Sequence, residues 1–220
     1  VHLQVSYFDE KKDVTKNYLE ESAAKVDELL ALPFRNIFVE NSTGNVQVNF
    51  TKKGKALVNK SKPSVTSVDL SKRYLEWGRR NFRLNQLDPA QHEFIYGDTL
   101  EWLRRLAKKD RHFDVVLLDP PTFSQSKQSG AFRAEKDYDR LVAAALPLLT
   151  EAGVLFASTN AAGWPPGEFL AGIEHAIRRA RRQIVQRHYV PQPPDFPVSR
   201  AEPAYLKTVW LRACLPVVGG

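Results

Sequence analysis

Three aspartates that end apolar segments are the first candidates for chemistry in this sequence. Asp69 closes VTSVD, Asp98 follows EFIYG, and Asp119 ends FDVVLLD. A carboxylate at the end of a buried strand can accept hydrogen bonds from ribose hydroxyls or from the amino group of a base. The alternative role is to cap the helix that follows. Ser71 is the better cap for its helix, which favours ligand binding by Asp69, whereas the two roles are evenly balanced for Asp98.

The stretch Asp119-Pro120-Pro121, with Phe123 after it, is more specific than a lone aspartate. Proline fixes φ and removes a backbone donor, so this corner is rigid and leaves carbonyl oxygens unpaired. Rigid carbonyls beside a carboxylate can hold an amine or the edge of an electron-poor ring, and an aromatic ring can stack on a planar base. The alternative is a structural turn. The place of the corner in a series of acidic strand ends favours a binding or catalytic site.

A regular alternation of strand and helix patterns positions these residues. From residue 65 onward, buried-strand segments such as VTSVDL and EFIYGD alternate with amphipathic helix patterns of ten or more residues, such as SKRYLEWGRRNFRLNQL. Thr99 is expected to cap the helix TLEWLRRLAKK. The alternation predicts an α/β fold, with a Rossmann-like, doubly wound and mostly parallel sheet. Ligands of such sheets bind beyond the carboxyl ends of the strands, where the aspartates lie.

The two ends of the chain depart from this alternation. The last two strand patterns, QIVQRHYV and AYLKTVWLRA, are joined only by the proline-rich residues 191–203, so the last strand is expected to be antiparallel. Residues 1–51 are expected to form a small lead-in, with a helix in KNYLEESAAKVDELL and a β-hairpin in NIFVENSTGNVQVNF. Residues 52–220 then form the main domain, with KGKALVN as a candidate for its first strand.

The composition narrows the class of protein. The chain has 220 residues, of which 43% are hydrophobic and 26% charged, as in ordinary globular proteins. Its net charge of +7 is a weak sign of a polyanionic partner. No apolar run reaches the roughly 20 residues of a membrane span, so no membrane association is expected. The single cysteine, Cys214, fits a reducing compartment and a cytoplasmic protein. The histidines lack metal-ligand spacing, so no metal is expected.

A larger set of segments resembles a known family. FDVVLLDPPTFSQSK, VTSVDLSKRYLEWGRRNFRLNQL, GDTLEWLR and AYLKTVWLR are similar to segments of the class I S-adenosylmethionine-dependent methyltransferases. Over about residues 65–213 the chain resembles the bacterial enzymes that methylate cytosine C5 or guanine N7 of large-subunit ribosomal RNA. The resemblance implies RNA as the partner and S-adenosylmethionine as the cofactor. It places Asp69 and Leu70 at the cofactor ribose, and Asp98 and Thr99 at the adenine.

The same resemblance assigns the Asp-Pro-Pro corner to methyl transfer. It implies that Asp119, Pro120, Pro121 and Phe123 form the corner where the methyl group passes to a flipped base. Asp119 would also border the cofactor.

One part of the family pattern is expected to be missing. The family has a glycine-rich loop, roughly FxYTGxF, after its first strand, where the backbone must pass close to the cofactor. Here KGKALVNKSKPS leads directly to VTSVD, so the loop is expected to be absent near residues 59–64. A non-catalytic RNA-binding relative that has lost its cofactor loop is therefore an alternative hypothesis. A nicotinamide dehydrogenase is a third, but the Asp-Pro-Pro corner and the lack of GxGxxG argue against it.

The choice of target atom depends on the available nucleophiles and bases. Methylation of cytosine C5 needs a cysteine nucleophile, but the relevant strand ends in FASTNAAGW and Cys214 lies in the last strand. Guanine N7 carries a lone pair and needs only alignment. An exocyclic amine needs a proton acceptor, which Asp119 can supply. Guanine N7 or an amino group is therefore ranked above C5.

Basic and aromatic residues near the corner are candidates for RNA binding. They are Lys127, Arg133, Lys136, Trp164 and Arg200. The first three flank the Asp-Pro-Pro corner, and Arg200 lies in the loop expected at the same sheet edge. Trp164 follows a neighbouring strand and could bracket a base together with Phe123, although packing is equally plausible. The arginine-rich residues 178–182 are better explained as a solvated helix face.

Overall fold

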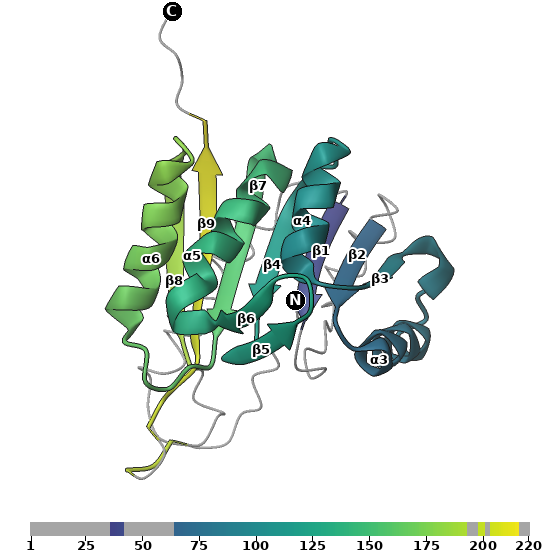
Figure 1. Cartoon of the computed structure of the whole chain (residues 1–220), viewed down its shortest axis with the longest axis horizontal. Coiled ribbons are helices and arrows are strands. Elements are labelled where there is room, and N and C mark those ends of the chain that lie inside the picture. Colours follow the sequence, from purple (N-terminus) through teal and green to yellow (C-terminus); the bar gives the residue numbers. More distant parts are fainter. Residues whose placement is uncertain (1–35, 42–63, 193–197, 201–202, 216–220) are drawn as a thin grey trace, which may run out of the picture.

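A seven-stranded sheet forms the centre of the protein (Figure 1). The computed structural model describes residues 36–41, 64–192, 198–200 and 203–215. Along the sheet the strands follow the order β3-β2-β1-β4-β7-β9-β8. Their bounds are β1 (Asn36–Asn41), β2 (Ser64–Asp69), β3 (Glu93–Tyr96), β4 (Phe113–Asp119), β7 (Leu149–Thr159), β8 (Gln183–Pro191) and β9 (Lys207–Cys214).

The pairing confirms the predicted fold class. The strands from β3 to β7 are paired in parallel, while β9 is antiparallel to both of its neighbours, β7 and β8. A second, two-stranded antiparallel sheet consists of β5 (Phe123–Ser126) and β6 (Gly130–Arg133). This β5–β6 hairpin comes directly after the Asp-Pro-Pro corner and was not predicted from the sequence.

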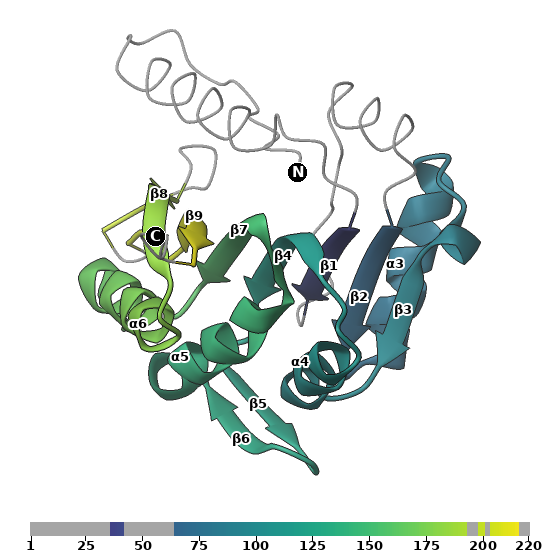
Figure 2. The same cartoon turned by 90° about the horizontal axis from the view of Figure 1, so that it is seen from above.

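The helices cover both faces of the sheet. Figure 2 shows α4 (Thr99–Lys108), α5 (Ala134–Ala145) and α6 (Pro166–Arg179) in a row along one face. Helix α3 (Lys72–Leu84) packs against β2 and β3. Two short 3-10 turns, η1 (Pro89–Gln91) and η2 (Leu146–Leu148), complete the described elements. The predicted cap of α3 is confirmed, because the Ser71 side chain accepts a hydrogen bond from the Tyr74 amide at 3.3 Å.

Strand β4 is buried on both faces, as its continuous apolar run predicts. Val116 and Leu118 belong to the large core beneath α4, α5 and α6. Leu117 points to the opposite face, where it joins Val65 and the partly buried Phe82 of α3. Because successive side chains of a strand alternate between faces, one segment anchors both layers of helices. The carboxyl end of β4, which carries the Asp-Pro-Pro corner, is therefore held rigidly.

Replacing Leu103 by alanine should test how much the α4 layer contributes. Leu103 is fully buried in α4, at 0% exposure, so the change leaves a cavity. We expect the free energy of unfolding to fall by about 2–5 kcal/mol, measured by denaturant unfolding. The neighbouring Arg104→Ala, at an exposed position, is the control and should change it by less than about 0.5 kcal/mol. A loss no larger than the control's would contradict this packing.

The prediction of a β-hairpin over residues 36–50 is wrong for its first strand. Strand β1 pairs in parallel with β2 on one side and with β4 on the other, so both of its edges are occupied. A hairpin partner would need one of those edges. Strand β1 therefore belongs to the main sheet, although it lies before the expected domain boundary at residues 51 and 52. The expected helix in KNYLEESAAKVDELL, the turn at Thr43-Gly44-Asn45 and the segment KGKALVN lie outside the described residues.

The expected absence of the glycine-rich loop stays a prediction, because residues 42–63 lie outside the described residues. Strands β1 and β2 are parallel neighbours, and residues 42–63 connect them. A parallel connection needs a dozen or more residues, and this interval supplies them. In the sheet, β1 lies between β2 and β4.

Candidate functional site

The carboxyl ends of β2 and β4 and the turn after β3 open on one cavity of about 290 Å³. Most residues predicted to contact a cofactor or a base line this cavity: Asp69, Leu70, Asp98, Thr99, Pro120, Pro121 and Phe123. The hairpin adds further walls through Ser126, Ser129 and Phe132. Asp119 is partly buried and directly precedes the lining residue Pro120. Residues far apart in the sequence are thus brought together, as the sheet-edge argument predicts.

Asp69 presents an acceptor oxygen that the described residues do not use. Its side chain is 6% exposed, and its Oδ1 accepts a hydrogen bond from the Ser71 amide at 2.5 Å. Its Oδ2 is buried and has no hydrogen-bond partner within the described part of the chain. Burial raises the pKa of Asp69 to about 6, although the Ser71 amide works in the opposite direction. A buried acceptor without a donor is costly, so this oxygen suits a ligand that brings a donor.

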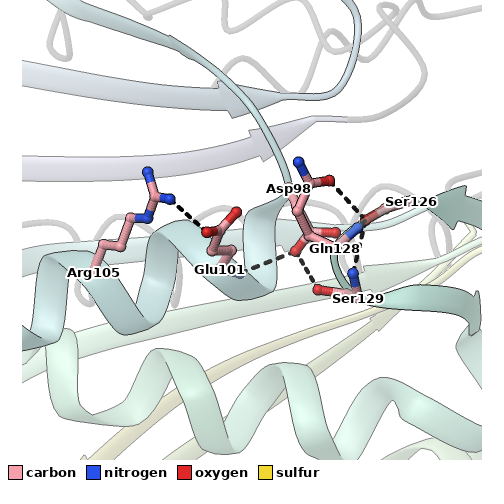
Figure 3. Close-up of polar contacts among 6 residues, drawn as sticks. All are labelled: Asp98, Glu101, Arg105, Ser126, Gln128 and Ser129. Atoms are coloured by element: carbon pink, nitrogen blue, oxygen red, sulfur yellow. Dashed lines mark hydrogen bonds and ion pairs between the residues drawn. The ribbon is translucent and has the colours of Figure 1, made fainter.

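Asp98 caps helix α4 and also ties the hairpin to it (Figure 3). Its Oδ1 accepts hydrogen bonds from the Glu101 amide at 3.0 Å and from the Ser129 hydroxyl at 2.6 Å. The prediction that Thr99 caps this helix is wrong, because Thr99 is already its first residue. Burial alone would raise the pKa of Asp98. The hydrogen bonds from Ser126, Ser129 and the backbone outweigh burial and lower that pKa, so Asp98 stays ionised.

The β5–β6 turn is built to present Ser129 to Asp98. The buried Ser126 hydroxyl accepts hydrogen bonds from the Gln128 amide at 3.1 Å and the Ser129 amide at 3.0 Å. Gly130 follows with a positive φ of 76°, which favours glycine. The signal for this turn was the run SQSKQSG, but its flanking strands of four residues each are too short for a clear period-two pattern.

Removal of the Ser129 hydroxyl should loosen this connection. In Ser129→Ala we expect the pKa of Asp98 to rise, because one of the hydrogen bonds that stabilise its carboxylate is lost. We also expect the free energy of unfolding to fall by about 1–2 kcal/mol. Titration of the Asp98 carboxyl carbon by NMR measures the first effect. The control Gln125→Ala changes an exposed residue of the same hairpin, and an equal shift in both variants would refute the tie.

The Asp-Pro-Pro corner combines a perturbed carboxylate with an exposed ring. Burial raises the pKa of Asp119, and a hydrogen bond from the Ser158 side chain partly offsets this. Phe123 is 50% exposed at the start of β5, opposite Arg133 of β6. The Arg133 guanidinium lies 5.1 Å from the centre of the Phe123 ring. A cation over an aromatic ring at the mouth of the cavity suits a planar, electron-rich group with phosphates nearby.

The predicted RNA-binding residues divide into two groups. Lys127, Arg133 and Lys136 are exposed on the hairpin and the start of α5, beside the cavity, and Arg200 is exposed in the stretch 198–200. The expectation that Trp164 stacks on a base is wrong. Trp164 is 7% exposed and packs against Tyr138 and Phe169 in the core, with ring centres 5.8 and 5.2 Å away.

The sequence analysis also missed a buried lysine at the same edge of the sheet. Lys207 begins β9 opposite Thr159 and is 3% exposed. Its Nζ donates hydrogen bonds to the carbonyl oxygens of Ala161, at 2.9 Å, and Tyr205, at 2.7 Å. Burial lowers the pKa of Lys207, and the charge of Glu135 opposes this. A lysine inside the apolar segment YLKTVW was the available signal. The hydrogen bond from Lys207 to Ala161 holds the loop that follows β7.

Three further observations concern metal ligands, the cysteine and the helices of the described residues. Within these residues, no three histidine, cysteine, aspartate or glutamate side chains gather as metal ligands. Cys214 ends β9 and pairs with Gln183 at the start of β8. It therefore lies at the amino ends of the parallel strands, whereas the cavity lies at their carboxyl ends. Among the described helices, none is long and apolar enough to cross a membrane.

A sheet of this order, with acidic residues and an Asp-Pro-Pro corner at its carboxyl edge, is that of a class I methyltransferase. The sequence profile of the S-adenosylmethionine-dependent methyltransferase family matches residues 43–212, and the chain belongs to this family.

Curated relatives carry names from ribosomal RNA methylation. The chain is 29% identical over 189 residues to the ribosomal RNA large subunit methyltransferase K of Neisseria meningitidis, covering 86% of this chain and 49% of that protein. It is 43% identical over 100 residues to the K/L enzyme of a Psychrobacter species, covering 44% of this chain and 12% of that protein. The match thus spans about half the length of the Neisseria protein and a much smaller part of the Psychrobacter protein.

Solved structures agree with the fold. One neighbour is SMU.776, assigned as a methyltransferase and solved with S-adenosylhomocysteine, with a TM-score of 0.65, 24% identity and coverage of 88% of this chain and 49% of that chain. Another is an S-adenosylmethionine-dependent methyltransferase of Agrobacterium tumefaciens, with a TM-score of 0.61 and 14% identity. The match covers 90% of this chain and 61% of that chain.

The cavity fits the cofactor of this family. S-adenosylmethionine carries a ribose whose hydroxyl groups are hydrogen-bond donors, and the buried Asp69 Oδ2 is an acceptor without a partner in the described chain. The ionised Asp98 lies on the same cavity wall. Donor and acceptor types therefore match.

Proposed function

We propose that this chain carries the catalytic domain of an enzyme that methylates a base of ribosomal RNA. In this proposal Asp69 holds the ribose of S-adenosylmethionine, with Leu70 beside it, and Asp98 and Thr99 border the adenine. The bound cofactor supplies an electrophilic methyl group on its sulfonium. The chain's own residues hold the acceptor base and align its nucleophilic atom.

The observation that carries the proposal is that Asp69 Oδ2, which has no partner among the described residues, belongs to an aspartate lining the same cavity as Pro120, Pro121 and Phe123. The cavity lining offers an acceptor for hydroxyl groups at Asp69, and a rigid corner and a ring for a planar group at Pro120, Pro121 and Phe123. Together they suit a nucleoside cofactor beside a nucleobase. The names of the curated relatives and the net charge of +7 support RNA as the carrier of that base.

The sequence that follows β1 also bears on this proposal. The residues that follow Asn41 in the sequence are Ser42-Thr43-Gly44, which contain the Thr-Gly pair of the family pattern FxYTGxF but not its tyrosine. This partial match of the sequence to the family pattern supports a retained cofactor site and weighs against the alternative of a relative that has lost it.

On the acceptor side, Phe123 and Arg133 would stack the base, while Lys127, Lys136 and Arg200 would contact phosphates. Guanine N7 or an amino group is favoured over cytosine C5, because the single cysteine lies at the opposite edge of the sheet. In this proposal Asp119 accepts a hydrogen bond from the acceptor base.

Incubation with in vitro transcribed large-subunit ribosomal RNA and methyl-labelled S-adenosylmethionine tests the proposal. Digestion to nucleosides then identifies the product, and we expect a methylated guanosine or an amino-methylated nucleoside. Formation of 5-methylcytidine would contradict the ranking of target atoms. Cofactor binding without transfer to the RNA would contradict ribosomal RNA as the substrate, and RNA binding without cofactor binding would favour the non-catalytic alternative.

A further inference from the structure

A buried tyrosine hydroxyl bridges β4 and β7 next to the Asp-Pro-Pro corner. The parallel pairing of these strands extends to Leu118 opposite Ala157. At this point the Tyr138 hydroxyl of α5 accepts a hydrogen bond from the Ser158 amide at 2.9 Å. Its single proton lies within reach of two carbonyl oxygens, those of Ser158 at 2.8 Å and Leu118 at 3.1 Å. One side-chain atom thus joins the ends of both strands.

The ring that carries this hydroxyl is held firmly. Tyr138 is 2% exposed, and its ring meets Phe169 edge to face, with centres 5.3 Å apart. Trp164, which precedes α6, packs against the same ring with ring centres 5.8 Å apart. Well-packed aromatic side chains leave little room for another rotamer. The hydroxyl therefore has one position, set by the core beneath the sheet.

Both residues that the hydroxyl reaches also act on Asp119. Leu118 immediately precedes Asp119 in β4, and the Ser158 side chain donates a hydrogen bond to its carboxylate. Tyr138 itself is not among the residues that line the cavity. Its influence on the site therefore passes through its neighbours.

We propose that Tyr138 is a positioning residue for methyl transfer, which fixes the orientation of Asp119 through Leu118 and Ser158. This inference rests on the proposed role of the Asp-Pro-Pro corner in holding the acceptor base. Reactions that depend on alignment are sensitive to small displacements of the groups that hold the substrate. A hydroxyl that ties the carboxylate to the core supplies such alignment.

The variant Tyr138→Phe removes the hydroxyl and keeps the ring. With ribosomal RNA as acceptor, we expect kcat to fall about tenfold, because the corner loses its alignment. The Kd for S-adenosylmethionine should stay within about threefold, since the ribose acceptor Asp69 is untouched. Tyr74→Phe in α3 removes a tyrosine hydroxyl elsewhere and is the control. A Tyr138→Phe variant with the control's kcat would overturn the proposal.

Titration of the cofactor-free chain gives a readout that does not depend on activity. The carboxyl carbon of Asp119 is followed by NMR in the wild type, Tyr138→Phe and Tyr74→Phe. We expect the pKa of Asp119 to rise in Tyr138→Phe only, because a displaced Ser158 stabilises the carboxylate less. A titration that is unchanged from the wild type would overturn the role assigned to Tyr138.

A second variant covers the case in which Tyr138→Phe does not fold. Ser158→Ala leaves the backbone bridge to Tyr138 and removes only the donor to Asp119. The same rise in the Asp119 pKa and the same selective loss of kcat are expected, and their absence would overturn the inference. If the wild type transfers no methyl group to ribosomal RNA, the proposed substrate is wrong, whereas the NMR titrations still decide whether Tyr138 orients Asp119.

Discussion

The variant Asp69→Asn should bind S-adenosylmethionine about 10- to 100-fold more weakly than the wild type, because a hydrogen bond to a charged acceptor contributes about 1.5–3 kcal/mol. The amide nitrogen of asparagine cannot accept a bond, whereas the buried Oδ2 can, and no described residue donates one to it. Calorimetric titration of the full chain measures the change. Asp88→Asn is the matched control, since Asp88 is an exposed cap of η1 and asparagine also caps well. Equal affinity in both variants would exclude Asp69 from the cofactor site.

The pKa of Asp69 adds a pH dependence to this prediction. Because that pKa is about 6 in the free protein, the carboxyl becomes protonated as the pH falls through 6. A protonated oxygen is a poorer acceptor, so cofactor affinity should decline between pH 7 and pH 5. The decline should vanish in Asp69→Asn. A wild-type affinity that does not change over this range would contradict the assignment.

The same shift has an opposite effect on stability. A carboxyl whose pKa is higher in the folded state than its unfolded value of 3.8 binds extra protons in the folded state between about pH 4 and 6. The stability contributed by Asp69 therefore falls as the pH rises through this window. At about 1.4 kcal/mol per pKa unit, the cost at neutral pH is about 3 kcal/mol. Asp69→Asn should thus stabilise the cofactor-free protein at pH 7.5. Weaker cofactor binding by this variant would therefore not result from unfolding.

The strongest predictions from sequence were those in which one pattern allowed one structure. The run Val115-Val116-Leu117-Leu118 is apolar on every residue, which requires a strand covered on both faces, and β4 is such a strand. Aspartates at the ends of parallel strands must meet at one sheet edge, and the cavity confirms that Asp69 and Asp98 do. These conclusions needed only periodicity and connectivity.

Where the sequence analysis failed, local patterns were compatible with two structures. The residues NIFVENSTGNVQVNF combine alternation with a Thr-Gly-Asn turn signal, which a hairpin and a strand followed by a loop both produce. Only the pairing of β1 with β2 and β4 separates the two. Trp164 likewise follows a strand in the sequence whether it faces a ligand or the core. The bridge through Tyr138 joins residues 20 positions apart on each side, and no periodicity carries such contacts.

The variant Asp119→Asn should lower kcat about 1,000-fold if the acceptor is an amino group, because loss of a positioned proton acceptor costs about 100- to 10,000-fold. Its Kd for the cofactor should change much less than that of Asp69→Asn. The measurement is single-turnover methyl transfer to ribosomal RNA between pH 5 and 9. Asp114→Asn is the control, because Asp114 lies in the same strand but near its opposite end.

The pH dependence separates the two favoured target atoms. Burial raises the pKa of Asp119, so its carboxylate becomes protonated at a higher pH than that of an exposed aspartate. If Asp119 accepts the hydrogen of an amine, the wild-type rate of methyl transfer should fall as Asp119 becomes protonated. Asp119→Asn should then abolish this fall of the rate at low pH and remove most of the activity. If guanine N7 is the acceptor, no proton is lost and Asp119 only aligns the ring, so the asparagine variant should keep much of its rate and the same pH profile. The shape of one rate profile thus shows whether the Asp-Pro-Pro corner acts as a base or as a template.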